Sequence, residues 1–197
     1  MVFDLVMDER RMSVVAPTPL GAIGVVWSDA GIVATWMHAG TVERAREHIR
    51  RAYPDAVPAV PPPPAIAAAL AEIASLLGGG PQDLRRVALD MRRVPDFDRR
   101  VYEVARTIPP GSTMTYGEVA KALDEEPMRA RDVGVALARN PFAPIVPCHR
   151  VVAANGRLGG YSAPGGTATK RHLLELEGAA IVAPPRQAGL FDALGES

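Results

Sequence analysis

The sequence predicts an α/β N-terminal domain, built from a small sheet and a helix, followed by a mostly α C-terminal domain that contains a helix-turn-helix. Apolar and β-branched residues flank the turn signal Ser-Asp-Ala-Gly at 28–31, which is typical of a β-hairpin. Beyond residue 93 the apolar residues recur at helical spacing instead. A chain of 197 residues is long enough for one large domain or two small ones. The predicted units are an extension (1–11), the α/β domain (12–92), the C-terminal domain (93–179) and a tail that we expect to be flexible (180–197).

The elements of the N-terminal domain follow from local patterns. The hairpin covers residues 16–37, and residues 41–54 have helical character up to a terminating proline. The proline-rich stretch 54–64 reads as an extended connector without regular hydrogen bonds. Residues 65–80 are good helix formers ended by glycines, and residues 83–94 read as a further strand.

The C-terminal domain begins with a helix over residues 95–108, for which Asp96 is the expected N-cap. Thr115 and Glu118 have the spacing of a capping box at the start of a second helix. A third helix over residues 128–140 follows a short turn and stops at an Asn-Pro pair. Two short helices joined by a tight turn are typical of DNA-binding helix-turn-helix units, and also of ordinary helical cores.

Charge and composition favour an ordinary globular protein and exclude several classes. Residues 1–90 carry 8 basic and 10 acidic side chains (−2), residues 91–178 carry 13 and 10 (+3), and the rest contribute −1. This difference is compatible with a nucleic-acid-facing C-terminal half and equally with scatter. The sequence shows no signal peptide and no apolar run of about 20 residues, so we expect a cytoplasmic protein without membrane contact.

Cys148 is the single cysteine, so the chain forms no internal disulfide and holds no multi-cysteine metal site. It lies between Pro147 and His149. A nucleophilic cysteine needs a nearby base, but adjacent side chains on an extended segment point apart, so we expect a bridging water between Cys148 and His149. Glu177 is a candidate to orient that histidine. The alternative, a buried structural cysteine, is an equally ordinary use of this residue.

The residues around Cys148 carry a family resemblance. Four stretches resemble the O6-alkylguanine-DNA alkyltransferases. They are the motif VPCHRVV with an Asn-Pro pair eight residues before the cysteine, the stretch GRLGGYSAPGG, and the upstream stretches IPPGSTMTYGEVAKAL and RARDVGVALARNP. The resemblance covers residues 12–178. It implies a ribonuclease-H-like N-terminal domain and a winged-helix-like C-terminal domain. The activity that it implies is direct-reversal DNA repair, in which the alkyl group of O6-alkylguanine moves irreversibly to a cysteine. O4-alkylthymine is a second candidate substrate on the same basis.

The resemblance implies a role for each residue of the catalytic group. Cys148 would accept the alkyl group by in-line displacement, and His149 would take the thiol proton through a water. Glu177 would orient His149, and Asn140 would hold the active-site turn. Tyr116 would donate its hydroxyl to the leaving guanine. A thioether has no route back to the thiolate, so the protein would act once and be consumed.

The resemblance also implies a DNA-facing surface and a base pocket. The target nucleotide must leave the duplex, and Arg131 would fill the space that it vacates. The other DNA-binding residues would be Ala130, Gly134 and Thr115, and the pocket would be lined by Val151, Tyr161, Ser162 and Leu137. Asp132 departs from the family pattern because an acid there would repel phosphates unless it pairs with Arg129. The loop at 163–169 is longer than the common one, which leaves the range of alkyl groups open.

The family resemblance also implies which partners the protein binds. We expect double-stranded DNA with an alkylated guanine as partner, no cofactor, no metal, a monomeric protein, and association with the bacterial nucleoid when DNA is bound. The tail sequence QAGLF at 187–191 resembles the short peptides that dock on the replication sliding clamp, or it packs on its own domain. Three rival readings are a lesion sensor that does not transfer the group, a winged-helix regulator with a structural cysteine, and a cysteine hydrolase that turns over repeatedly.

Overall fold

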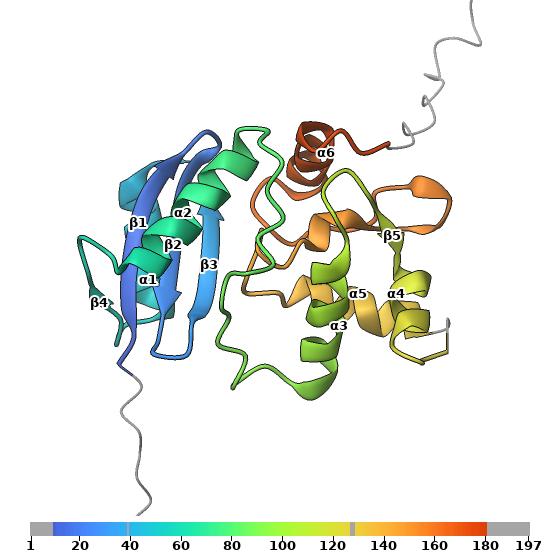
Figure 1. Ribbon diagram of the computed structural model, residues 1–197, viewed down its shortest axis with the longest axis horizontal. Coiled ribbons are helices and arrows are strands. Elements are labelled where there is room, and N and C mark those ends of the chain that lie inside the picture. The colour runs from blue at the N-terminus through green and yellow to red at the C-terminus, as the bar shows by residue number, and fades with distance from the viewer. Residues whose placement is uncertain (1–9, 39, 127–128, 181–197) are drawn as a thin grey trace, which may run out of the picture.

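The computed structural model describes residues 10–38, 40–126 and 129–180 (Figure 1). A small sheet with two helices forms the N-terminal half, and a group of helices with a two-stranded sheet forms the C-terminal half. This agrees with the predicted mixed α/β architecture. None of the helices in the described ranges is long and apolar enough to cross a membrane.

The N-terminal sheet is an antiparallel meander with one short parallel strand added. Strands β1 (Met12–Thr18), β2 (Gly21–Trp27) and β3 (Ile32–His38) follow one another, and β4 (Val57–Pro58) pairs with β1, which gives the order β3-β2-β1-β4. The turn at residues 28–31 joins β2 to β3, so the predicted hairpin is confirmed.

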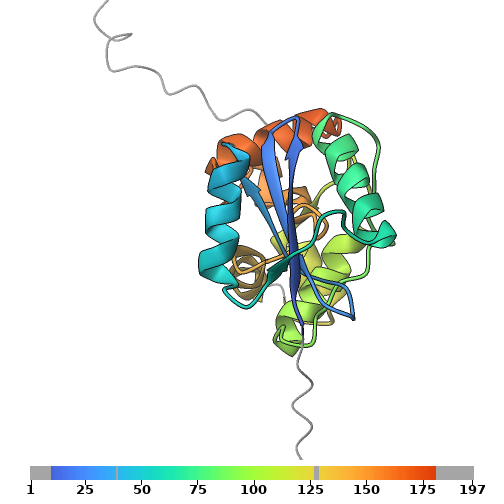
Figure 2. The same cartoon turned by 90° about the vertical axis from the view of Figure 1, so that its left-hand side faces the viewer.

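Two helices cover opposite faces of this sheet (Figure 2). On one face, α1 (Val42–Ala52) approaches β2 so closely that a Cβ atom on Gly24 would meet the side chain of Ile49. On the other face, Ile23 shares the main core with Ile73 of α2 (Pro64–Leu77). Strand β2 is therefore buried on both sides.

Two predictions for the N-terminal half are wrong. The connector at 54–64 does hold regular hydrogen bonds, because Val57 and Ala59 still have N–H groups and donate them to carbonyls of Arg11 and Ser13, both at 2.9 Å. Residues 83–94 form turns with one isolated bridge instead of a strand. The guanidinium of Arg106 takes up carbonyl groups in this segment, among them Val87 O at 2.8 Å, so a partner strand is not needed.

The C-terminal half contains α3 (Asp96–Thr107), β5 (Met114–Thr115), α4 (Tyr116–Ala122), α5 (Ala130–Ala138), the 3₁₀ turns η2 (Cys148–Arg150) and η3 (Ala154–Gly156), β6 (Val151–Val152) and α6 (Gly166–Leu176). The capping box is confirmed, since Glu118 N donates to Thr115 Oγ1 at 3.1 Å and Thr115 N to Glu118 Oε2 at 2.6 Å. The predicted cap Asp96 is wrong: Pro95 is the N-cap, and Asp96 inside the first turn accepts a hydrogen bond from Arg99.

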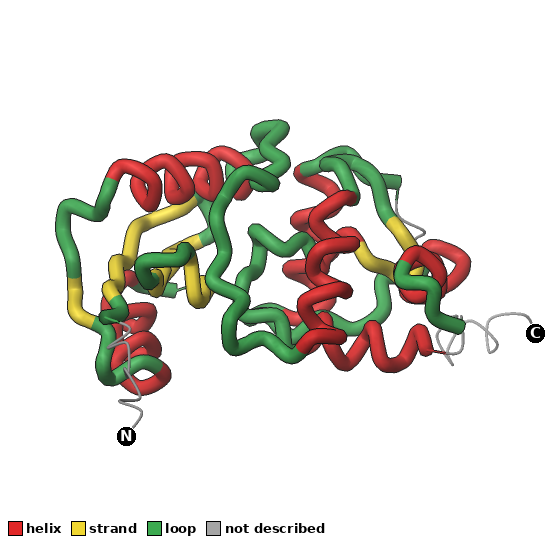
Figure 3. The backbone as a smooth tube through the Cα atoms, turned by 60° about the horizontal axis from the view of Figure 1, so that its bottom comes forward, coloured by secondary structure: helices red, strands yellow, loops and turns green. Residues whose placement is uncertain are grey.

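The two halves share one hydrophobic core. Figure 3 shows the loops that run between the two halves. Thr35 on the edge strand β3 donates its backbone N–H to Pro141 O at 2.7 Å and its hydroxyl to Ala143 O at 2.5 Å. The turn that precedes Cys148 is therefore attached to the edge of the N-terminal sheet.

Candidate active site

The single cysteine begins a 3₁₀ turn. Cys148 N donates to Val146 O at 2.8 Å, and Arg150 N donates to Pro147 O at 2.9 Å. Cys148 and His149 therefore lie in a turn and not on an extended segment. Cys148 itself is buried, with 7 % of its surface exposed.

Asn140 holds the turn that leads to the cysteine. Its Nδ2 donates to Val146 O at 3.0 Å, and its Oδ1 accepts from Phe142 N at 2.9 Å. Burial raises the pKa of the Cys148 thiol, and a hydrogen bond from Asn140 acts in the opposite direction. Asn140 thus lies behind the cysteine. It holds the backbone of the turn before Cys148, and its hydrogen bond favours the thiolate form of the side chain.

His149 and Glu177 form a buried pair across two elements, η2 and the C-terminal end of α6. His149 Nε2 lies 2.9 Å from Glu177 Oε1, while His149 Nδ1 is buried and has no hydrogen-bond partner within the described chain. Burial lowers the pKa of His149 and the carboxylate opposes that effect. A carboxylate accepts only, so Nε2 carries the proton and Nδ1 presents a lone pair.

Arg150 is a member of this group that the sequence interpretation missed. Its side chain is 1 % exposed, and it donates from Nε and Nη2 to the carboxylate of Glu177 at 2.8–3.2 Å. A third nitrogen, Nη1, donates to Ile108 O at 2.6 Å. An arginine inside the apolar run PIVPCHRVV was the available signal, since a buried cation requires a partner.

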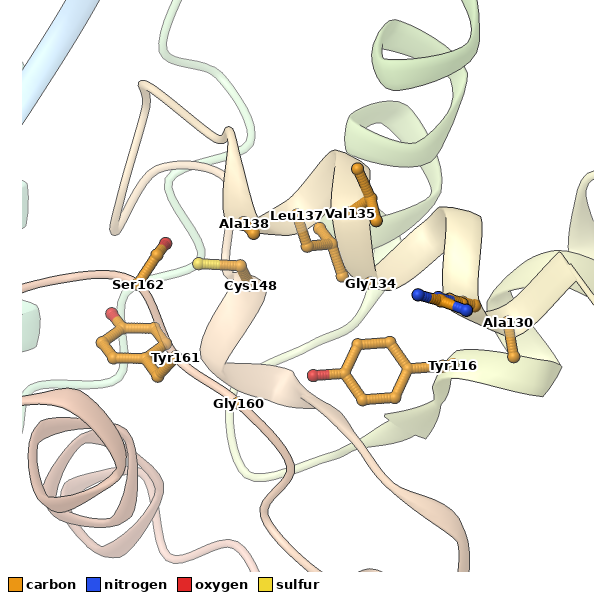
Figure 4. A pocket seen from close by; sticks show the side chains of 11 residues that line it. Tyr116, Ala130, Gly134, Val135, Leu137, Ala138, Cys148, Gly160, Tyr161 and Ser162 are labelled. Atoms are coloured by element: carbon orange, nitrogen blue, oxygen red, sulfur yellow. The ribbon is translucent and has the colours of Figure 1, made fainter.

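A cavity of about 530 Å³ opens beside the thiol (Figure 4). Its lining comes from α4, α5, η2 and the loop before α6, and the hydroxyl end of Tyr116 points inward. The predicted residues that line it are Tyr116, Ala130, Arg131, Gly134, Leu137, Cys148, Tyr161 and Ser162; Val135, Ala138 and Gly160 complete it. Asn140, His149 and Glu177 do not line the cavity but lie behind the cysteine.

Two further predicted residues do not line the cavity. The side chain of Val151, predicted to line the pocket, is fully buried in β6, which pairs with β5. Thr115, predicted to face DNA, uses its hydroxyl to cap α4. The backbone carbonyl of Val151 accepts a hydrogen bond from Lys170.

Lys170 is a second buried cation that the sequence interpretation did not assign to the site. Its ammonium group donates to Val151 O at 2.6 Å and Gly160 O at 3.2 Å, and it lies 5.6 Å from the ring centroid of Tyr116. Burial lowers the pKa of Lys170 to about 8. Lys170 therefore fastens α6 to the loop that forms one wall of the cavity. Its charge opposes the rise that burial causes in the pKa of Cys148.

The two tyrosines of the cavity are neutral hydroxyl groups at physiological pH. Burial raises the pKa of both Tyr116 and Tyr161. The hydroxyl of Tyr161 is buried beside Cys148 without an aligned hydrogen-bond partner in the described chain. Gly159 leaves room for Tyr116, because a Cβ atom there would lie 3.0 Å from the phenol oxygen.

In the described part of the chain, no three His, Cys, Asp or Glu side chains lie close enough together to hold a metal ion. The arrangement places one thiol at the wall of a largely apolar cavity, with a neutral imidazole, a carboxylate and an amide behind it. Such a group can deliver a thiolate to a carbon atom of a molecule that enters the cavity.

Comparisons with known proteins agree with this geometry. Residues 96–179 match the profile of a family described as 6-O-methylguanine DNA methyltransferase, DNA binding domain. The chain is 37% identical over 163 residues to a methylated-DNA–protein-cysteine methyltransferase of Methanothermobacter thermautotrophicus, which covers 83% of each protein. It also resembles the crystal structure of O6-methylguanine methyltransferase from Mycobacterium tuberculosis, with a TM-score of 0.66 and 34% identity over 88% of this chain and 96% of that one. The structure of the mycobacterial protein in complex with DNA gives a TM-score of 0.67 and 33% identity over 85% and 92%.

Proposed function

The chain belongs to the methylated-DNA–protein-cysteine methyltransferase family, and from this premise we propose that Cys148 is the residue that accepts the alkyl group. The protein repairs alkylated DNA by direct reversal: an alkyl group on O6 of guanine is transferred to a cysteine. One observation carries the assignment, because the chain contains a single cysteine and that cysteine lies in the wall of the cavity.

In the proposed reaction, the sulfur of Cys148 attacks the alkyl carbon, the new S–C bond forms and the C–O6 bond breaks. The thiol proton passes through a water molecule to Nδ1 of His149, and Glu177 stabilises the imidazolium that results. The free lone pair on buried Nδ1 supports this route. The low pKa of Glu177, lowered to about 2, supports a fixed negative charge in this position.

The leaving guanine carries the electron pair of the broken bond. We assign Tyr116 the role of donating a hydrogen bond to the base as this charge develops, which is an electrostatic contribution to the transition state. Its inward-pointing hydroxyl and its raised pKa support the assignment, because the group stays protonated. The carbonyl of Val151 and the backbone at Cys148 would read the edge of the base.

The base reaches the cavity after the nucleotide is flipped out of the duplex, which costs a few kcal/mol. Helix α5 would lie along the DNA with Arg131 filling the vacated space, and Ala130 and Gly134 would let the helix approach closely. Arg131 lines the mouth of the cavity and is exposed, which supports this role. The thioether product cannot revert, so each molecule acts once. O4-alkylthymine is proposed as a second substrate.

Finer features are proposed on the same family basis. The N-terminal half would be ribonuclease-H-like and the C-terminal half winged-helix-like, with the domain boundary near residue 92. We propose a monomer that works in the bacterial cytoplasm and on the nucleoid. The clamp-docking peptide at 187–191 lies outside the described residues; deleting it should abolish capture of the sliding clamp in a pull-down, and unchanged capture would contradict it.

Intact mass spectrometry tests the proposed function. The wild type and Cys148→Ser are incubated with a duplex that contains one O6-methylguanine. We expect the wild type to gain the mass of one methyl group, mapped to Cys148, and the variant to gain none. Repair should stop at one lesion per protein molecule. Binding without a mass gain would indicate a lesion sensor, and repeated turnover would indicate a hydrolase; either result contradicts the proposal.

A further inference from the structure

The start of helix α5 carries a chain of alternating charges beside the cavity mouth. Arg129, the residue just before α5, donates from Nε to Asp132 Oδ2 at 2.8 Å and from Nη1 to Glu125 Oε2 at 3.0 Å. Glu125 also pairs with Arg100 of α3 at 3.3 Å. The guanidinium of Arg129 stacks 4.9 Å from the ring centroid of Phe97. Two acids and an aromatic ring therefore hold one exposed cation against the protein.

The arginines of this region consequently differ in whether their guanidinium groups already bind a carboxylate. Arg139 pairs with the buried carboxylate of Asp98 at 2.9 Å, and Arg129 is engaged as described. Arg131 is exposed at the cavity mouth and makes no side-chain hydrogen bond or ion pair with the rest of the described chain. Only one of these three guanidinium groups is thus presented to solvent without a carboxylate partner.

Asp132 contributes to this difference between Arg129, which is paired within the described chain, and Arg131, which is not. With 3.6 residues per turn, it lies 100° around α5 from Arg131, on the flank of the face that lines the cavity. Its side chain is 51 % exposed, so a DNA backbone on that flank could reach both Asp132 and Arg129. Exposed ion pairs are worth only about 0–1 kcal/mol, so phosphates compete with Asp132 for the same guanidinium.

We propose that Asp132 retains Arg129 on the protein and thereby limits non-specific affinity for DNA, which leaves Arg131 as the guanidinium that engages the lesion site. This inference rests on the proposed function. Binding that depends on few phosphate contacts has a shallow dependence on salt, because each contact contributes about 0.9 to the slope of log affinity against log salt concentration. Asp132 therefore acts as a specificity-determining residue that reduces binding to undamaged DNA.

The test measures the salt dependence of binding to an undamaged duplex. In Asp132→Asn, Arg129 loses one of its two carboxylate partners and keeps Glu125. The remaining exposed pair competes weakly with a phosphate, so Arg129 should gain a phosphate contact and the slope should steepen by about 1. The ratio of the variant's affinity to that of the wild type should then fall about fourfold between 50 and 200 mM salt. Asp124→Asn is the matched control: it removes one negative charge from the preceding turn, and Asp124 has no side-chain partner within the described chain, so its slope should stay near that of the wild type.

A double variant separates restraint of Arg129 from simple repulsion. If Asp132 acts through Arg129, then adding Asp132→Asn to Arg129→Ala should leave the slope unchanged. An equal steepening in that background, or no steepening in Asp132→Asn alone, would overturn the inference. Methyl transfer to Cys148, followed by intact mass with a lesion-containing duplex, is measured on the same samples. Loss of transfer in the wild type would refute the proposed function instead, whatever the slopes.

Discussion

At the scale of single residues, the site depends on one carboxylate that serves two partners. Glu177 faces the imidazole of His149 and the guanidinium of Arg150, and its side chain is 3 % exposed. Burial acts to raise the pKa of Glu177, but the hydrogen bonds and positive charges of these partners outweigh it and lower the pKa from 4.5 to about 2. The same carboxylate therefore orients the base and neutralises a buried cation.

Replacing Glu177 by Gln should strongly lower both the free energy of unfolding and the rate of alkyl transfer. The buried guanidinium of Arg150 would lose its counter-charge, which costs about 3–5 kcal/mol of unfolding free energy. The alkyl-transfer rate should fall as well, because His149 loses its partner. Urea unfolding and single-turnover transfer measure the two effects. Glu175→Gln, an exposed acid on the same helix, is the control and should behave like the wild type.

The lowered pKa of Glu177 predicts that the protein loses stability in acid. The folded-state pKa of Glu177 lies below its unfolded value, so its contribution is complete above pH 4.5 and is lost as the pH falls towards about 2. Thermal unfolding between these pH values should show this loss in the wild type. An identical acid dependence in Glu177→Gln would contradict the assignment.

At the scale of elements, the cavity depends on the approach of the loop before α6 to helix α4. Gly159 has a φ of +68° and leaves space for the phenol of Tyr116, whereas Gly160 has no atom within 4 Å of an added Cβ. Lys170 binds the carbonyl of Gly160 and fixes the loop from the α6 side. One wall of the cavity is thus positioned by two different elements.

Gly159→Ala and Gly160→Ala form a matched pair of substitutions in this loop. Gly159→Ala introduces backbone strain and displaces Tyr116, so it should cost about 1–3 kcal/mol of unfolding free energy and slow alkyl transfer. Gly160→Ala should be nearly neutral in stability. Thermal unfolding and transfer assays of both proteins decide the question, and equal effects of the two substitutions would contradict the proposed contact.

At the scale of the whole molecule, the N-terminal sheet supports the active-site turn although it contributes no residue to the cavity. Thr35 on the edge strand β3 holds this turn by donating hydrogen bonds to the carbonyls of Pro141 and Ala143. Asn140 then connects this turn to Val146, two residues before the cysteine. The path from the sheet to the thiol therefore consists of short, direct hydrogen bonds.

Thr35→Val keeps the shape of the side chain but removes its hydroxyl. The carbonyl of Ala143 would lose a partner, which should cost about 1–2 kcal/mol. Hydrogen exchange of the amides at 142–148 should speed up, because the turn is held less firmly. Thr35→Ser retains the hydroxyl and is the control. Unchanged exchange in Thr35→Val would mean that the sheet does not support the turn.

Local patterns were sufficient to predict the elements whose stability is local. The hairpin turn at 28–31, the capping box at Thr115 and the helices α2 and α3 follow from hydrogen bonds and periodicity within a few residues. Residues 83–94 were mispredicted because their carbonyls are satisfied by Arg106, which lies outside any local window. The short strand β4 was missed for a similar reason, since its partner β1 is distant in sequence.

The sequence by itself determined the chemistry: a single cysteine in a Pro-Cys-His-Arg motif, with the residues that the family resemblance attached to it. The tertiary structure alone decided which side chains face the cavity and which support it from behind. It buried Val151 and gave Arg150 and Lys170 partners inside the protein. The physical reason is that partners for buried charges come from distant segments, whereas caps, turns and helical periodicity are complete within one segment.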